Sequence, residues 1–157
     1  MELQIIRTRH PPDDYLQQLV TLLQSEYAEI TPDGLRVRLA LLPDDDRFFL
    51  ALDAEILIGY AHFRVTHGLA HGDGAELLDL IVSAQHRREG VGRRLMTAGE
   101  IWAAQAERAK LVIRADVVRT EVLAFFSALG YEPASTSQEY VRDLEAPRRA
   151  EAPTQPQ

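Results

Sequence analysis

The residues best suited to chemistry lie in one short stretch, residues 86–94, with the sequence HRREGVGRR. It holds four arginines and two glycines in nine positions of a chain whose formal net charge is −7. Arg87, Gly90 and Gly92 form an R-x-x-G-x-G pattern directly before an apolar helical repeat. Free N–H groups and the positive end of the dipole at a helix start attract anions, and guanidinium groups add charge-assisted hydrogen bonds. The pattern therefore predicts a phosphate-binding loop.

Two other interpretations of the glycines compete with this one. The first is a solvated turn followed by a flexible helix start. The second is a dinucleotide-binding G-x-G-x-x-G motif with Asp116 as the ribose-binding acid, which would indicate a nucleotide-binding oxidoreductase. The dinucleotide motif fails because Leu95 replaces its third glycine and because the preceding chain is typical of antiparallel hairpins. A buried strand before the loop and a helix after it favour the phosphate-binding loop over a simple turn.

Apolar patterns predict the elements that must position this loop. Residues 75–83, AELLDLIVS, are apolar on both sides and predict a central strand covered on two faces. After Val91, Leu95 and Trp102 recur at helical spacing and predict a helix that ends near residue 108. The order of the elements predicts a mixed sheet with helices on both faces. The other predicted strands are 2–8, 47–53, 56–68, 109–117 and 139–144, and the other predicted helices are 16–27, 35–42 and 122–129.

Length and composition predict one globular domain over residues 1–144 and a disordered tail over residues 145–157, which has three prolines and no apolar periodicity. The absence of cysteine excludes disulfides and thiolate metal sites, and we expect no metal. The excess of 24 acidic over 17 basic residues argues against a nucleic-acid partner. Without an apolar run of ~20 residues or a signal-peptide pattern, we expect a cytoplasmic protein that does not bind membranes.

Three segments together resemble the GNAT superfamily of acetyl-CoA-dependent N-acetyltransferases. Residues 75–96 are similar to the central strand, loop and helix start of that family, which carry its [Q/R]-x-x-G-x-[G/A] signature. Residues 56–63, ILIGYAHF, resemble its third strand, and residues 125–133, FFSALGYEP, resemble its C-terminal helix with a Gly-aromatic pair. The resemblance covers about residues 1–144. It implies an α/β (α+β) GNAT fold, in which about four helices flank a twisted, mixed, mostly antiparallel sheet of about six or seven strands.

The resemblance implies acetyl-CoA as the cosubstrate. In the family's pattern the central strand offers backbone groups to the pantetheine arm, and the loop surrounds the pyrophosphate through mostly main-chain contacts. We expect the strand to separate from its neighbour through a bulge, because only then are backbone groups free to pair with an extended ligand. The implied pantetheine residues are Leu80, Ile81 and Val82, and the implied pyrophosphate residues are Arg87, Arg88, Glu89, Gly90, Val91, Gly92 and Arg93.

Acetyl transfer to an amine needs a group that removes a proton, because an amine with a pKa of ~10.4 is almost fully protonated near neutral pH. The resemblance implies Glu76 as the general base, since it lies eleven residues before Arg87. Asp79, His62 and a water-relayed path are alternatives. Alternation places His62 on one strand face with Tyr60 and Arg64, and an exposed polar surface is the simpler interpretation of that face. The backbone N–H of Val82 is the implied donor to the oxyanion.

Two family features are absent from the C-terminal part. Phe126 stands where many relatives have a tyrosine that protonates the leaving thiolate, and Arg119 stands where they have an asparagine. Ser127 or Tyr131 could replace that tyrosine, or the thiolate could leave unprotonated, because a thiol pKa of ~8.5 makes this tolerable.

The resemblance predicts an N-acetyltransferase that moves acetyl from acetyl-CoA to a primary amine by direct attack in a ternary complex. The alternative is a catalytically impaired CoA-binding sensor of the same fold. The implied acceptor wall comprises Glu26, Tyr27, Glu29 and the loop at residues 66–74. It does not distinguish a small molecule from a protein amine. Homodimers are common in the family, so a homodimer is a further expectation.

Overall fold

The structure is a computed structural model that describes residues 1–70 and 72–144. The tail predicted at residues 145–157 lies outside the described residues, as does position 71 in the predicted acceptor loop. Among the described helices, none is long and apolar enough to cross a membrane.

One five-stranded sheet forms the centre of the fold, with its strands in chain order across the sheet. The first three pairings are antiparallel, and β4 pairs with β5 in parallel. The expectation of six or seven strands is therefore wrong for the described residues. The strands are β1 (Leu3–Thr8), β2 (Arg47–Asp53), β3 (Ile56–Thr66), β4 (Gly74–Val82) and β5 (Leu111–Ile113).

The missing strand is the one predicted at residues 139–144, which are irregular in the structure. Its apolar residues Tyr140, Val141 and Leu144 are 88%, 78% and 85% exposed, so no core holds this segment against the sheet. The neighbouring strand β5 is also only three residues long, against a prediction of 109–117, and offers a short edge for pairing. An alternating pattern alone did not suffice to form a strand there.

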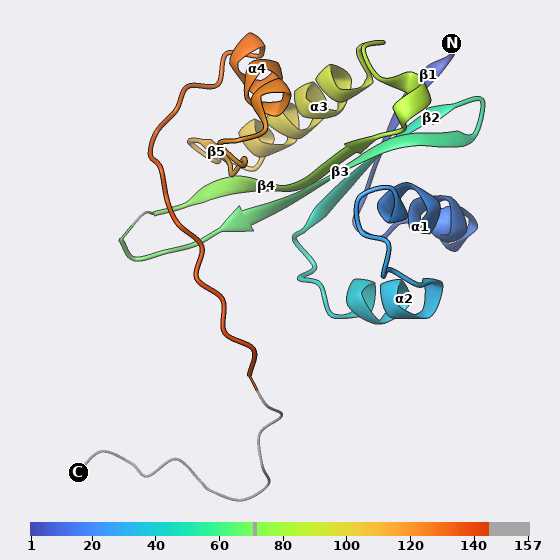
Figure 1. Ribbon diagram of the computed structural model, residues 1–157, viewed down its shortest axis with the longest axis horizontal. Coiled ribbons are helices and arrows are strands. Elements are labelled where there is room, and N and C mark those ends of the chain that lie inside the picture. Colours follow the sequence, from blue (N-terminus) through green and yellow to red (C-terminus); the bar gives the residue numbers. More distant parts are fainter. Residues whose placement is uncertain (71, 145–157) are drawn as a thin grey trace, which may run out of the picture.

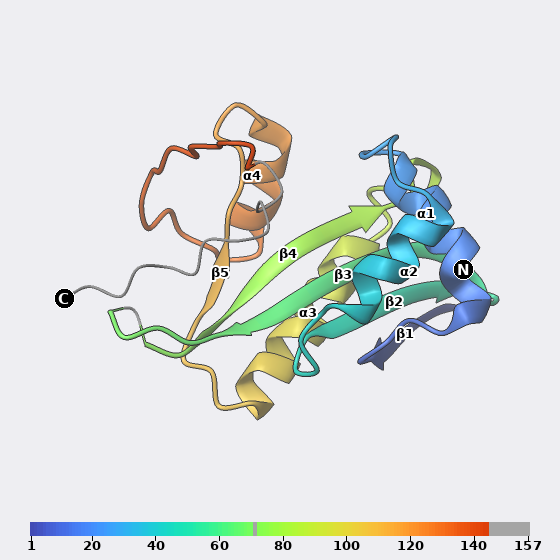
Figure 2. The same cartoon turned by 90° about the horizontal axis from the view of Figure 1, so that it is seen from below.

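Four helices cover the two faces of the sheet (Figures 1 and 2). α1 and α2 lie on one face, and α3 and α4 lie on the other. α2 begins earlier than predicted because Pro32 occupies its first turn and the Thr31 side chain accepts a hydrogen bond from the Gly34 N–H at 3.1 Å. The helices are α1 (Leu16–Gln24), α2 (Pro32–Ala40), α3 (Val91–Gln105) and α4 (Thr120–Ala128).

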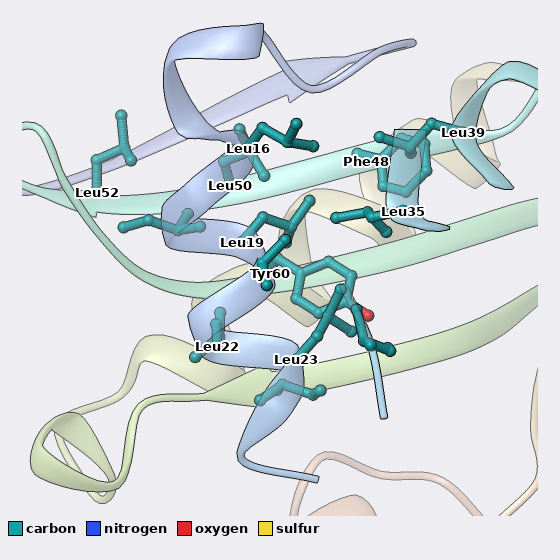
Figure 3. Close-up of a cluster of buried hydrophobic side chains, with 14 residues drawn as sticks. Leu16, Leu19, Leu22, Leu23, Leu35, Leu39, Phe48, Leu50, Leu52 and Tyr60 are labelled. Atoms are coloured by element: carbon teal, nitrogen blue, oxygen red, sulfur yellow. The ribbon is translucent and has the colours of Figure 1, made fainter. Parts of the chain in front are cut away.

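The first core lies between α1, α2 and the sheet (Figure 3). Leu16, Leu19 and Leu23 recur at helical spacing in α1 and are buried against β2 and β3. Each fully buried leucine of this kind stabilises the fold by about 1.5–3 kcal/mol. Tyr60 of β3 is 3% exposed within the same cluster, so this face of β3 is covered rather than solvated.

The second core lies between the sheet and α3, and it depends on one close approach. Phe63 of β3 is fully buried, with the Phe49 and Trp102 rings at centroid distances of 5.5 and 6.0 Å. Gly99 of α3 lies directly over the Phe63 ring, and a Cβ atom at Gly99 would overlap ring atoms. The glycine thus sets how closely α3 approaches the sheet.

Replacement of Gly99 with alanine is expected to lower the free energy of unfolding by about 1–3 kcal/mol, because the overlap outweighs the higher helix propensity of alanine. Urea unfolding at pH 7.5 measures this change. In a double-mutant cycle, Phe63→Leu should make the Gly99→Ala substitution less costly by at least about 1 kcal/mol. Strictly additive effects of the two substitutions would show that the ring does not limit the approach of α3.

Candidate functional site

The two C-terminal strands of the sheet separate halfway along β4. β5 pairs with β4 only at Ala75, Glu76 and Leu77, whereas β4 stays paired with β3 as far as Val82. The register with β3 also shifts at this point, so that Leu78 is an extra residue in β4. The expected bulge and strand separation are therefore present.

A cleft of about 900 Å³ opens where the strands separate. The second half of β4 forms one wall of the cleft. The other wall consists of the residues that follow β5 and of α4. The arginine-glycine loop, residues 86–94, closes one end. Every residue predicted to contact the cosubstrate lines this cleft except Glu89. Glu26 and Tyr27 of the expected acceptor wall also line it, whereas Glu29 and the described residues of the loop, 66–70 and 72–74, do not.

The loop leads into α3 through two residues in the left-handed backbone region. Arg88 has φ +63°, and Gly90, which precedes the first helical residue, has φ +83°. The first helical hydrogen bond runs from the Arg94 N–H to the Gly90 carbonyl at 3.1 Å. The N–H groups of the first three helical residues consequently have no acceptor within the helix. Together with the dipole of α3 they form an anion-binding helix start.

The two glycines of the loop serve different purposes. Nothing lies within 4 Å of a Cβ atom placed on Gly90, so its positive φ is what requires glycine. A Cβ atom on Gly92 would lie 3.1 Å from Cζ of Phe125, so Gly92 allows α4 to pack against the start of α3. The second glycine thus holds one wall of the cleft in place.

Backbone groups in the second half of β4 point alternately toward β3 and toward the cleft. The Ser83 N–H donates to the Ile58 carbonyl at 2.8 Å, so it points toward β3. By alternation the N–H and carbonyl groups of Val82 and Leu80 point away from β3, and those of Ile81 point toward it. The Arg87 Nε lies 3.3 Å from the Val82 carbonyl and links the loop to the strand. Leu80 and Val82 therefore present backbone groups to the cleft.

Asp79 is the carboxylate that β4 brings into the cleft. Burial raises its pKa, while hydrogen bonding from the Tyr60 hydroxyl and the positive potential of His62 act in the opposite direction. The charge of Asp79 in turn raises the pKa of Tyr27, whose hydroxyl also faces the carboxyl group. The group is a partly buried carboxyl between two tyrosines from distant parts of the chain, an arrangement suited to proton transfer.

His62 lies directly opposite Asp79 in the β3–β4 register, and it is buried. The expectation that its strand face is an exposed polar surface is therefore wrong, because α1 and α2 cover this face. The Nε2 atom of His62 lies 2.8 Å from Oδ2 of Asp46. Asp46 is fully buried, and its carboxylate also accepts hydrogen bonds from Arg64 at 3.0 Å. Phe48 stacks on the ring at 4.3 Å. Burial lowers the pKa of His62 despite the bond to Asp46.

Glu76 lies outside the cleft walls. It forms an ion pair with Arg114, and it lies opposite Arg64 in β3. Its side chain is 21% exposed. Glu76 and Asp79 are alternatives for the general base in the sequence, and in the structure only Asp79 lines the cleft.

The position expected to supply a general acid has no hydroxyl. Phe126 lines the cleft, and neither Ser127 nor Tyr131 is among its lining residues. The Tyr131 hydroxyl donates to Glu100 in α3 at 2.9 Å, and burial raises its pKa. Arg119 lines the cleft just before α4. In residues 1–70 and 72–144, no group of His, Asp or Glu side chains is arranged to hold a metal ion.

Comparison with known proteins identifies relatives of this chain. The sequence profile of the acetyltransferase (GNAT) family matches residues 15–131. Probable N-acetyltransferase 14 of Mus musculus is 42% identical over 67 residues, which are 39% of this chain and 32% of the mouse protein. The same protein of Bos taurus is 39% identical over 71 residues, 41% of this chain and 34% of the bovine protein. The matched part thus spans about a third of the length of these relatives.

Solved acetyltransferase structures have the same fold at low sequence identity. Aminoglycoside N-acetyltransferase AAC(6')-Iy in complex with CoA has a TM-score of 0.79 and 18% identity, with 91% of this chain and 96% of that chain covered. The aminoglycoside acetyltransferase meta-AAC0020 from an uncultured soil metagenomic sample, in complex with sisomicin, has a TM-score of 0.76 and 21% identity over 91% and 97% of the chains. A putative acetyl transferase from Pyrococcus furiosus has a TM-score of 0.71 and 19% identity over 90% and 100%.

The two left-handed residues of the loop predict stability changes of opposite sign. Arg88→Gly should raise the free energy of unfolding by up to about 1 kcal/mol, because glycine adopts φ +63° without a Cβ clash. Gly90→Ala should lower it by about 1 kcal/mol or more, since alanine is strained at φ +83°. Urea unfolding without ligand measures both. Changes of the same sign would show that loop strain is not the determining factor.

Proposed function

The chain belongs to the acetyltransferase (GNAT) family, and from this membership we propose that it transfers an acetyl group from acetyl-CoA to a primary amine by direct attack in a ternary complex. The observation that carries the proposal is the separation of β4 from β5 beyond Leu77, with the arginine-glycine loop at the end of the resulting cleft. No covalent enzyme intermediate is required, because the amine and the thioester meet in the same cleft.

The cleft supports acetyl-CoA as the cosubstrate in two ways. The N–H and carbonyl groups of Leu80 and the N–H group of Val82, which point away from β3, match the amide groups of an extended pantetheine, as an added strand would. The helix start at Val91 and the charges of Arg87, Arg88 and Arg93 suit the pyrophosphate. One solved relative of the same fold, AAC(6')-Iy, is in complex with CoA.

Asp79 is the general base that the geometry favours. It lines the cleft, and its raised pKa brings it nearer to the working pH of a proton acceptor than an ordinary carboxyl group. Glu76 stays a prediction for the same role, but its ion pair with Arg114 and its position outside the cleft favour a structural part. His62 would act through Asp79 as a positioning residue, because its ring is engaged by Asp46.

The Val82 N–H is the proposed donor to the oxyanion that develops on the thioester carbonyl. It points away from β3 by alternation, and a backbone donor in a rigid strand needs no reorganisation during the reaction. The thiolate departs without a protein acid, because Phe126 faces the cleft in place of a hydroxyl group.

The acceptor is proposed to be a cationic amine. Glu26 and Tyr27 line the same cleft as Asp79 and add an acidic group and a hydroxyl group there, although Glu26 also pairs with Arg87 at 3.7 Å. Sisomicin, found with the solved structure of meta-AAC0020, is an amine of this chemical class, and AAC(6')-Iy was solved with a bisubstrate analogue that joins CoA to acetylneamine. The carboxylates in the cleft support a cationic acceptor, and an assay is needed to identify it.

The enzyme and the CoA-binding sensor differ in one measurement. Release of free thiol from acetyl-CoA is expected to be saturable and to depend on an added primary amine, across a panel of aminoglycosides, polyamines and lysine peptides. Without an amine no stoichiometric burst of thiol should appear, because no acetyl-enzyme forms. Tight binding of CoA with no turnover across the panel would support the sensor instead.

Asp79→Asn should lower kcat by about 10²–10⁴-fold with CoA affinity unchanged, because the amide keeps the shape but accepts no proton. The matched variant Glu76→Gln should change kcat less than about threefold, and Asp33→Asn on α2 serves as a surface control. The pH dependence is measured with an acceptor amine of low pKa, so that the amine itself stays neutral. The kcat/KM of the wild type should then fall as the pH drops through the pKa of Asp79, which lies above the ordinary carboxyl value of 3.8. A greater loss of kcat in Glu76→Gln than in Asp79→Asn would instead assign the role of general base to Glu76.

A further inference from the structure

A second pocket lies at the opposite end of α3 from the cleft. It has a volume of about 450 Å³, and Arg7, Thr8, Arg9, Arg47, Trp102 and Gln105 line it. α3 begins at the arginine-glycine loop and ends at Gln105, so its 15 residues separate the two places by about 22 Å at 1.5 Å per residue. The second pocket is therefore distinct from the acetyl-CoA cleft.

Three arginines, of which Arg7 and Arg9 are exposed, line this pocket although like charges repel. β1 and β2 are antiparallel, and their pairing ends with Thr8 opposite Phe48; continuing this register by one residue would place Arg9 opposite Arg47. Like charges directly opposite on neighbouring strands are destabilising. Burial lowers the pKa of Arg47, and the charges of Arg9 and Arg7 lower it further, against the opposing effect of Asp45 and Asp46.

The protein does not neutralise this cluster with carboxylates, although the chain has seven more acidic than basic residues. Throughout the described part of the chain, no ion pair is formed by Arg7, Arg9 or Arg47. Arg47 donates to the backbone carbonyls of Asp44 and Asp46 at 2.9 and 2.7 Å. The buried Asp46 carboxylate is already occupied by His62 and Arg64. The charges of Arg7 and Arg9, both solvent-exposed, are thus accessible to an external anion.

Neutralising the negative end of the α3 dipole does not explain the cluster. The terminal carbonyls of Trp102, Ala103 and Ala104 already accept backbone hydrogen bonds at 2.9, 2.9 and 3.0 Å. Arg7 reaches the helix end only through the Gln105 side chain, at 3.1 Å. One cation near a helix C-terminus is common, but it does not require two more on opposing strands.

We propose that the pocket formed by Arg7, Arg9 and Arg47 binds the phosphate group of a small phosphate monoester. Planar guanidinium groups match phosphate oxygens through paired hydrogen bonds, and three of them suit a dianion. The volume of about 450 Å³ exceeds what a phosphate ion needs, and Trp102 and Gln105, which also line the pocket, offer contacts to an attached organic group. The inference does not depend on acetyl transfer.

The full chain, saturated with CoA so that the loop at the cleft is occupied, is titrated calorimetrically with glycerol 3-phosphate and with inorganic phosphate. The ester should bind more tightly than inorganic phosphate, and Arg9→Gln should weaken its binding at least tenfold. The control Arg36→Gln, an exposed arginine of α2 paired with Asp33, should bind like the wild type. Equal affinity for both probes would assign the site to free phosphate and would overturn the proposal of a monoester ligand.

A second measurement separates a ligand site from a structural cluster. Without ligand, the melting temperature of Arg9→Gln should equal or exceed that of the wild type, because the repulsion with Arg47 is relieved. A lower melting temperature, or ester binding equal to that of the wild type, would overturn the proposal. If the protein does not bind CoA, the proposed function fails, but the difference between Arg9→Gln and Arg36→Gln in ester binding still tests this pocket.

Discussion

The site depends on one constraint: β4 lies inside the sheet, but only its first half is paired on both sides. Strand N–H and carbonyl groups held away from water need partners, so an unpaired half-strand is costly unless a ligand or solvent reaches it. The bulge at Leu78 and the departure of β5 after Ile113 produce this condition. Because α3 starts just beyond the same half-strand, the free backbone groups and the anion-binding helix end face one continuous cleft.

The two faces of β4 contribute differently to the site. On one face, Leu80 and Val82 pack toward α3 and α4, which keeps the cleft wall apolar. On the other face, Asp79 lies under the elements that bury Tyr60 and His62, and burial is the largest cause of its raised pKa. The core formed by α1 and α2 therefore stabilises the fold and also adjusts the acidity of the carboxyl group in the cleft.

The sequence predicted the elements and the loop well because both depend on local patterns. Nine of the ten predicted elements are present, and nearly all predicted cosubstrate residues line the cleft. The side-chain cluster was not predictable in the same way. Tyr27, Tyr60 and Asp79 meet only through tertiary packing and strand register, and nothing in the run PDDD at residues 43–46 distinguishes the buried Asp46 from its exposed neighbours. The strand at 139–144 failed because an alternating pattern does not supply a packing partner.

The absence of a hydroxyl at Phe126 weighs less against catalysis than the absence of a base would. At pH 7.5, deprotonating an amine with a pKa of ~10.4 costs about 4 kcal/mol, whereas releasing a thiolate whose thiol has a pKa of ~8.5 costs only about 1.4 kcal/mol more than releasing the thiol. Phe126 also packs against the Tyr131 ring at a centroid distance of 5.9 Å, and the Tyr131 hydroxyl donates to Glu100 of α3, which ties the end of α4 to α3. For the proposed acetyl transfer, a base such as Asp79 would therefore matter more than a proton donor at position 126.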